Sequence, residues 1–170
     1  MPSLIITAMS VIILAFAIVA GTNFVNPALQ SRIEVSRVLG SQYASISSAI
    51  ASYKIENQGV SPSSLDDVKG YVAAGAIDGF GHRSKIFSWS VEPGADGQGR
   101  LCLSYLSGSE GDYGTLMGLH RFVLDVAVQR PGRLTFAATC TGAATEVTVE
   151  GLADYLNESG ANLSIRFEDR

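Results

Sequence analysis

Residues 28–59, "ALQSRIEVSRVLGSQYASISSAIASYKIENQG", decide the fold of this chain. Apolar side chains recur there at steps of four, four, three, four and three residues, the period of an α-helix with one apolar face. Gly59 favours a helix C-terminal cap, and Pro62 prevents the helix from continuing. We expect the apolar stripe to form a helix–sheet core, and it consists of Val35, Leu39, Tyr43, Ile46, Ile50 and Tyr53.

The sequence that precedes this helix is apolar and has no ionisable side chain before Arg32. As a helix, residues 4–25 would extend about 33 Å, which is enough to cross the hydrocarbon core of a bilayer. A cleavable secretory signal has a basic N-terminal region and a shorter apolar core, and this sequence has neither. We therefore expect the apolar run to be retained as part of a long helix.

Asn26 and Pro27 mark the junction between the two parts of that helix. Because Pro27 lacks a backbone N–H, the junction is expected to kink the helix or to open a new helical turn. The prediction is one helix of two halves: residues 1–25 are apolar all round, and residues 26–57 are amphipathic. Residues 58–170 are expected to form a globular domain.

Within that domain, "SPSSLDDVKGYV" (residues 61–72) predicts a short helix that begins near Leu65 after a serine cap. The period then changes to two, which is typical of half-buried strands. The predicted strands are 85–91, 100–107, 121–129, 134–140, 146–150 and 162–169, with hairpins joining the first two and the next two. Residues 108–120 are expected to be a Gly-rich connection, and residues 151–160 a helical turn or two. The predicted fold class is α+β: a long N-terminal helix packed by its apolar stripe on an antiparallel β-sheet.

Cys102 and Cys140 are the two cysteines of the chain. In an exported protein such a pair favours a disulfide, which here would close the C-terminal region into a loop of 38 residues (140 − 102). The alternative is a pair of buried free thiols in a cytosolic core. The apolar opening run favours export, and with it the disulfide.

Little in the sequence indicates chemistry. The net charge is −4, and the 12 Lys and Arg residues are scattered singly, so no basic stripe for nucleic acid is present. His82 and His120 are the only histidines, and no nucleophile motif accompanies them. The cysteines lack the spacing of a metal site. We predict no catalytic residue, no metal ligand and no cofactor.

Three stretches resemble the type IV pilins and their relatives, which include type IVb pilins, minor pilins and pseudopilins. "SLIITAMSVIILAFAIVAG" (residues 3–21) is similar to the apolar start of a mature pilin. "AIASYKIENQGVSPSSLDDV" (residues 49–68) is similar to the end of the family's long helix. "IDGFGHRSKIFSWSV" (residues 77–91) is similar to the loop and first strand of pseudopilins. The resemblance spans residues 3–91, and the cysteine pair fits the family's habit of stapling a C-terminal loop to the sheet.

The resemblance implies a structural subunit of a pilus-like filament with a role in attachment or secretion. Before assembly it would be anchored in a bacterial inner membrane, with its globular domain in the periplasm. Its partners would be membrane lipid, the pilus assembly machinery, and copies of itself or other pilins in an extracellular helical filament. Met1 would be the modified, methylated N-terminus. The implied filament-core helix residues are Leu4, Ile5, Ile6, Ala8, Ile12, Ile13, Leu14, Phe16, Ile18 and Val19, and melting of the helix is expected at Asn26 and Pro27.

One position departs from the family pattern. Mature pilins usually have Glu at the fifth position, where its carboxylate pairs with the terminal amine of a neighbouring subunit, whereas this chain has Ile5. An amine without such a partner is costly in an apolar bundle. The departure favours a minor or tip subunit, although a major subunit with different packing remains open. The alternative is a membrane-anchored periplasmic binding or scaffold domain that does not polymerise.

Overall fold

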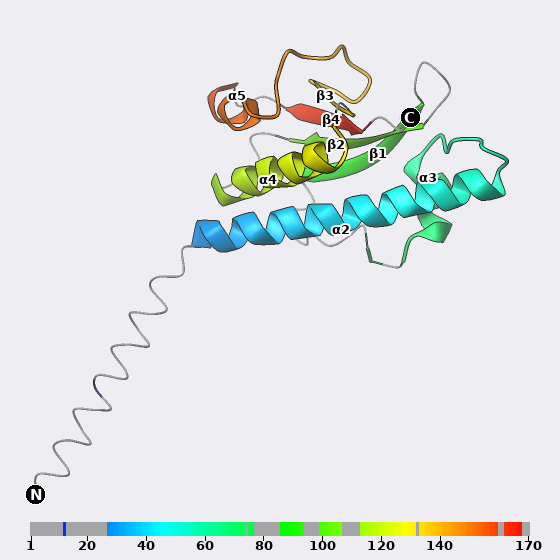
Figure 1. The fold of residues 1–170 in the computed structure, drawn as a ribbon, viewed down its shortest axis with the longest axis horizontal. Helices are drawn as coiled ribbons and strands as arrows, with labels where there is room; N and C mark the ends of the chain where they lie inside the picture. Colours follow the sequence, from blue (N-terminus) through cyan, green and yellow to red (C-terminus); the bar gives the residue numbers. More distant parts are fainter. Residues whose placement is uncertain are drawn as a thin grey trace, which may run out of the picture.

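The computed structural model describes residues 12, 27–73, 75–76, 86–93, 99–106, 113–131, 133–159 and 162–167. It consists of one antiparallel β-sheet and two long helices that lie side by side (Figure 1). This arrangement confirms the predicted α+β class. The elements are α2 (Pro27–Glu56), α3 (Leu65–Val68), η1 (Lys69–Tyr71), β1 (Phe87–Pro93), β2 (Gly99–Tyr105), α4 (Tyr113–Gln129), β3 (Leu134–Ala137), α5 (Leu152–Ser159) and β4 (Leu163–Phe167).

The sheet has the strand order β1-β2-β4-β3, and every neighbouring pair is antiparallel. The predicted hairpin of the first two strands and the predicted last strand are confirmed. The last strand of the chain, β4, lies between β2 and β3. Strands β2 and β3 are therefore parallel to each other, and α4 belongs to the connection between them.

The two faces of the sheet differ in chemistry because side chains alternate along each strand. One register row on the helix side is apolar: Trp89, Leu103, Ile165 and Phe136 lie across the four strands. The next row faces the other way and contains Ser90, Cys102, Arg166 and Thr135. The apolar face is covered by helices, and the serine-containing face meets the segment that follows β3.

Helix α2 has the predicted stripe. Its side chains Val35, Leu39, Ile46 and Ile50 are buried, and Tyr43 and Tyr53 are partly buried. The pattern did not indicate Gln42, which is also buried and whose Oε1 accepts a hydrogen bond of 2.9 Å from the Trp89 indole. This hydrogen bond satisfies two polar groups in the core and fixes α2 against β1.

Residues 121–129 are not a strand, and the predicted connection 108–120 is wrong over its last part. Residues 113–129 form helix α4 instead. "RFVLDVAVQ" fits both periods, but Leu119, Phe122, Val123 and Val126 recur at helical spacing and are buried. Packing against α2 selects the helix, because it buries all four on one side. The predicted hairpin of 121–129 with 134–140 is therefore absent, and β3 pairs with β4.

The prediction that the sheet packs on the α2 stripe was incomplete, because α4 also covers the apolar face of the sheet. Tyr43 of α2 and Phe122 of α4 both contact the aromatic rings of the sheet. The ring centroids of Tyr43 and Phe167 are 4.8 Å apart, and those of Phe122 and Trp89 are 6.3 Å apart. These four rings form an aromatic cluster that joins both helices to β1 and β4.

Residues 146–150, predicted as a strand, also do not form one. The chain makes a single bridge between Ala137 and Ala144, and the Thr145 amide donates to the Phe136 carbonyl oxygen at 2.7 Å. Further on, the Thr148 hydroxyl accepts a hydrogen bond of 3.1 Å from the Gly151 amide. This hydrogen bond between a side chain and a nearby backbone amide turns the chain toward α5, and bonds of this kind compete with strand pairing. The helical turn predicted at 151–160 is present as α5.

Both ends of the loop after α2 have defined caps. Gly59 has φ +88°, and its amide donates to the Lys54 carbonyl oxygen at 2.7 Å, which confirms the predicted C-terminal cap. At the start of α3, the Asp67 carboxylate accepts hydrogen bonds from the Ser63 hydroxyl and from the amides of Ser63 and Ser64. These bonds lower the pKa of Asp67, with the Ser63 hydroxyl as the largest cause.

Gln58 adopts φ 55°, a left-handed conformation in which a side chain is strained. Replacing Gln58 with glycine should therefore stabilise the protein by about 1 kcal/mol. Urea unfolding of the full chain in detergent measures the change. Gly59→Ala is the matched control, and it should destabilise the protein because it places a side chain at φ +88°. Equal midpoints for both variants and the wild type would contradict this account of the helix end.

Candidate functional site

Most of the residues predicted for the filament-core half, together with Met1 and Asn26, lie outside the described residues. Ile12 is described, and it is helical and exposed. Pro27 is the first residue of α2, a position where the missing N–H is harmless. Within the described ranges, no helix is both long and apolar enough to cross a membrane.

Helices α2 and α4 are parallel, and their N-terminal ends lie together (Figure 1). Two glycines of α4 allow this close contact. A Cβ added at Gly114 would lie 2.5 Å from the Ala28 carbonyl oxygen, and one added at Gly118 would lie 2.7 Å from the Val35 Cβ. The glycine pair at a spacing of four is the signal that could have predicted α4, since small residues at that spacing let helices approach closely.

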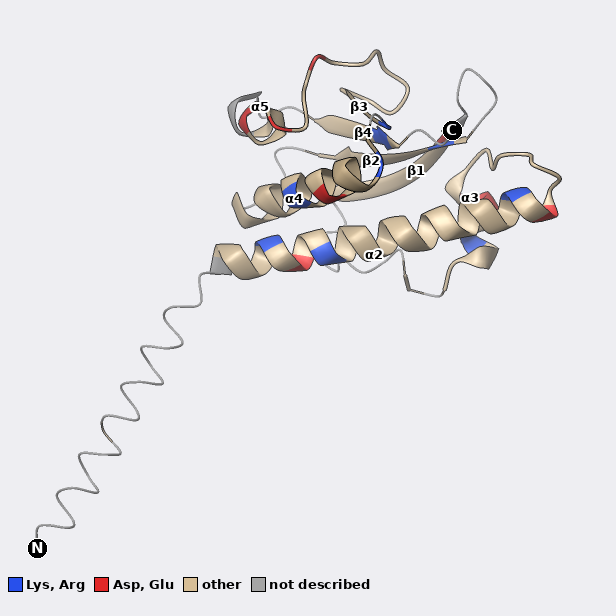
Figure 2. Ribbon diagram, in the orientation of Figure 1, with Lys and Arg blue, Asp and Glu red and all other residues tan. Residues whose placement is uncertain are grey.

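A groove of about 540 Å³ lies between the two helices. Its α4 wall includes Asp125, Gln129 and Arg130. Its α2 wall consists mainly of small side chains: Ser36, Gly40, Ala44, Ser47, Ser48 and Ala51. Between Arg37 and Lys54, α2 has no charged side chain (Figure 2). This part of α2 therefore presents a narrow surface of small, uncharged side chains opposite Asp125 and Arg130 of the other wall.

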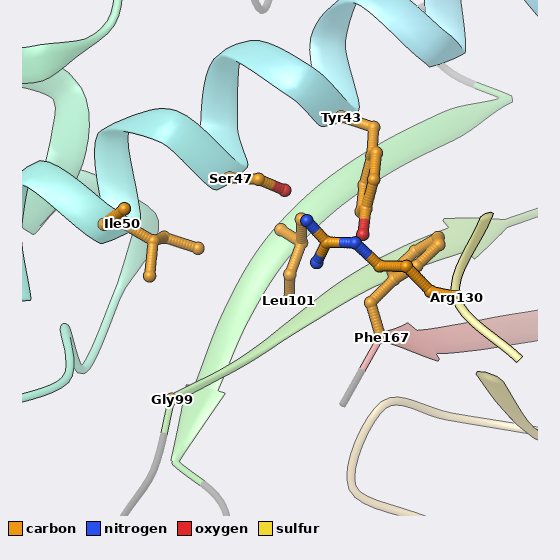
Figure 3. Close-up of a pocket in the computed structure, with 8 residues that line it drawn as sticks. Tyr43, Ser47, Ile50, Gly99, Leu101, Arg130 and Phe167 are labelled. Carbon is orange, nitrogen blue, oxygen red and sulfur yellow. The ribbon is translucent and has the colours of Figure 1, made fainter. Parts of the chain in front are cut away.

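Near the C-terminal end of α4 is a smaller pocket of about 130 Å³ (Figure 3). Ser47 and Ile50 of α2 line it together with Leu101 and Phe167 of the sheet. The Arg130 guanidinium carbon lies 5.7 Å from the centroid of the Tyr43 ring, in a cation–π contact that closes one side. Sites for metabolites commonly measure about 300–1,000 Å³, so this pocket is small for such a ligand.

The other face of the sheet is held by the Cys102–Cys140 disulfide, with Cα atoms 6.0 Å apart, and this confirms the predicted pairing. The Ser90 hydroxyl donates to Cys140 Sγ at 3.5 Å, and the Ser104 hydroxyl lies 3.3 Å from the same sulfur. Ser104 also hydrogen-bonds Ser164 at 3.2 Å. Sequence reasoning missed this hydroxyl cluster, although serines alternate with the apolar residues of β1, β2 and β4. The disulfide fastens the segment after β3 to the sheet.

The described residues offer few groups for chemistry. His120 Nε2 donates to the Val149 carbonyl oxygen at 3.1 Å, which holds the segment before α5 against α4. Burial raises the pKa of Tyr105. Over the described ranges, no three His, Cys, Asp or Glu side chains gather closely enough to hold a metal ion. His82 lies outside these ranges.

The long helix α2 and the parallel helix α4 pack together on the apolar face of the sheet. On the opposite face, the disulfide connects β2 to the segment after β3. Comparison of the chain with family models, with curated proteins and with solved structures gives no match in any of the three.

Proposed function

We propose that this protein is a structural subunit of a type IV pilus-like filament. Before assembly it is anchored in a bacterial inner membrane by its N-terminal helix, with the globular domain in the periplasm. It then polymerises through that helix into a filament with copies of itself or other pilins. One observation carries the proposal: an uncharged apolar run of 22 residues, 4–25, leads almost directly into α2, which begins at Pro27.

The physical basis of assembly is the exchange of lipid for protein around the apolar run. Helices in lipid gain little from apolar contact alone, so close packing through small residues drives their association. The run contains Ala8, Ala15, Ala17, Ala20 and Gly21. The α2 wall of the groove also consists mainly of small, uncharged side chains, which supports close contact with a further helix in the filament.

The disulfide supports an extracytoplasmic place for the domain. Disulfides persist in oxidising compartments such as the bacterial periplasm and the cell surface, and they are rare in the cytosol. The Cys102–Cys140 bond closes a loop that includes all of α4 and β3. A domain of this kind would also tolerate the outside of a cell once it is assembled.

Ile13→Asp tests the proposal. A carboxylate at the centre of the apolar run opposes insertion by about 3 kcal/mol, so the amounts in membranes and in filaments should fall at least about tenfold. Immunoblots of washed membranes and of filaments sheared from the native cells measure both fractions. Ile13→Val is the matched control, and it should leave both fractions unchanged. Normal filaments from Ile13→Asp would overturn the packing of this helix in the filament.

The second candidate is an anchored scaffold that does not polymerise. The chain has Ile5 in place of the carboxylate usual in mature pilins, a departure that fits this scaffold as well as a minor or tip subunit. Intact mass separates the two candidates. A methylated chain that begins at Met1 and is abundant in the sheared fraction supports the filament subunit. An unmethylated chain confined to membranes supports the scaffold.

A further inference from the structure

The shared N-terminal end of α2 and α4 exposes apolar side chains. Leu29 is 52% exposed, Ile33 is 50% exposed, and Tyr113 is 69% exposed. A shallow hollow of about 130 Å³ lies between Leu29 and Tyr113, lined also by Arg32 and Met117, and Ile33 follows Leu29 one turn along α2. These five residues, Leu29, Arg32, Ile33, Tyr113 and Met117, are called the basal patch below. Together they combine an aromatic hydroxyl, aliphatic side chains and a guanidinium, the composition found where proteins meet the bilayer interface.

Arg32 is the polar member of this patch and is only partly buried. Its Nε is buried and has no hydrogen-bond partner among the described residues, while the side chain lines the hollow between Leu29 and Tyr113. A long cationic side chain can cover apolar surface along its stem and reach a polar acceptor with its head. The phosphate of a lipid headgroup is such an acceptor, because guanidinium and phosphate form paired hydrogen bonds.

The short connection between the apolar run and α2 places the basal patch close to the membrane in which the proposed anchor lies. The apolar run ends at Val25 and α2 begins at Pro27, so these two Cα atoms are at most about 7 Å apart. Leu29 lies in the first turn of α2, and Gly114, next to Tyr113, contacts Ala28. If residues 4–25 cross the bilayer, the basal patch cannot lie far from the headgroups.

We propose that the basal patch rests on the headgroup region of the phospholipid bilayer before assembly. This inference rests on the membrane anchor of the proposed function. The sequence on either side of Tyr113 contains Glu110 and Asp112 as well as Arg121, so it carries no excess of positive charge. The contact therefore depends on apolar burial and on lipid phosphate, and it does not require an excess of anionic lipid.

The test uses the full chain in phosphatidylcholine vesicles and the Tyr113→Trp variant, with wild-type emission from the buried Trp89 subtracted. Bromine-labelled acyl chains should quench the added indole by about half. Val128→Trp is the matched control on the same helix: Val128 is 81% exposed and lies about 22 Å along α4 from Tyr113. The indole added there should not be quenched. Replacing up to a third of the lipid with phosphatidylglycerol should leave both results unchanged.

Each outcome separates the inference from the function on which it rests. Vesicle flotation first measures retention of the chain, and a chain that does not float with vesicles overturns both the anchor and the patch. A retained chain in which Tyr113→Trp is quenched no more than Val128→Trp overturns the patch alone. Blue-shifted but unquenched emission from Tyr113→Trp does the same, because protein would then cover the patch.

A second substitution on α2 tests whether the apolar side chains of the patch carry the contact. Leu29→Ser, combined with Tyr113→Trp, should weaken the quenching of the added indole because Leu29 lines the same hollow as Tyr113. Ile55→Ser, at the far end of α2, is the matched control and should leave the quenching unchanged. Equal quenching in both double variants would overturn the contribution assigned to Leu29.

Discussion

Replacing Gly118 with valine is expected to lower the free energy of unfolding by about 3 kcal/mol. Even a bare Cβ at this position would lie 2.7 Å from the Val35 Cβ and 2.9 Å from the Arg32 carbonyl oxygen. The backbone of α2 cannot yield like the end of a flexible side chain, so the two helices must separate. Their separation opens the aromatic cluster beneath them. Urea unfolding of the full chain in detergent, followed by the near-ultraviolet circular dichroism of Trp89, measures the loss.

Gly40→Ala is the matched control for this prediction. Gly40 also lies within a helix, but a Cβ added there would meet no atom of the described residues within 4 Å. Removing a glycine from a helix interior should stabilise the protein by about 1 kcal/mol. The two substitutions thus have opposite signs. Wild-type stability in Gly118→Val would show that α2 and α4 do not pack at the distance described.

Replacing both Cys102 and Cys140 with serine is expected to destabilise the protein by about 4 kcal/mol. The disulfide closes a loop of 38 residues, and its loss restores the conformational freedom of that loop in the unfolded chain. The segment after β3 would also lose its attachment to β2. The shift in the urea midpoint of the double variant measures the effect, and wild type treated with a reductant should show the same shift.

Ser90→Ala controls for the hydroxyl contacts around the disulfide. The Ser90 hydroxyl donates to Cys140 Sγ at 3.5 Å, a long and weak hydrogen bond. Its removal should change the free energy of unfolding by less than about 0.5 kcal/mol. Equal midpoints for oxidised and reduced wild type would show that the bond does not hold the native fold together.

The sequence was sufficient to predict the elements with one clear period or one local signal. The α2 stripe repeats at helical spacing over five turns, Gly59 ends the helix, and the first hairpin alternates cleanly in both strands. The cysteine pairing was predicted from the number of cysteines and the expected compartment. In each case the information lies within a short stretch or in the only pair that the sequence offers.

The elements that were missed depend on contacts between distant parts of the chain. Residues 121–129 fit a period of two as well as a period of 3.6, and only α2 beside them makes the helix the better solution. Gly114 and Gly118 resemble a flexible connection until Ala28 and Val35 are placed against them. The basal patch has the same origin, because Tyr113 meets Leu29 only through the parallel packing of two helices.

The disulfide has a mechanical consequence for a chain pulled from its two ends. The chain between Cys102 and Cys140, which are 38 positions apart in the sequence, cannot extend, and this withholds about 130 Å of length that a reduced chain would release. That closed loop includes all of α4 and β3 and ends within β2. A stretched molecule therefore extends only outside this closed loop, and β2 stays tied to the segment that follows β3.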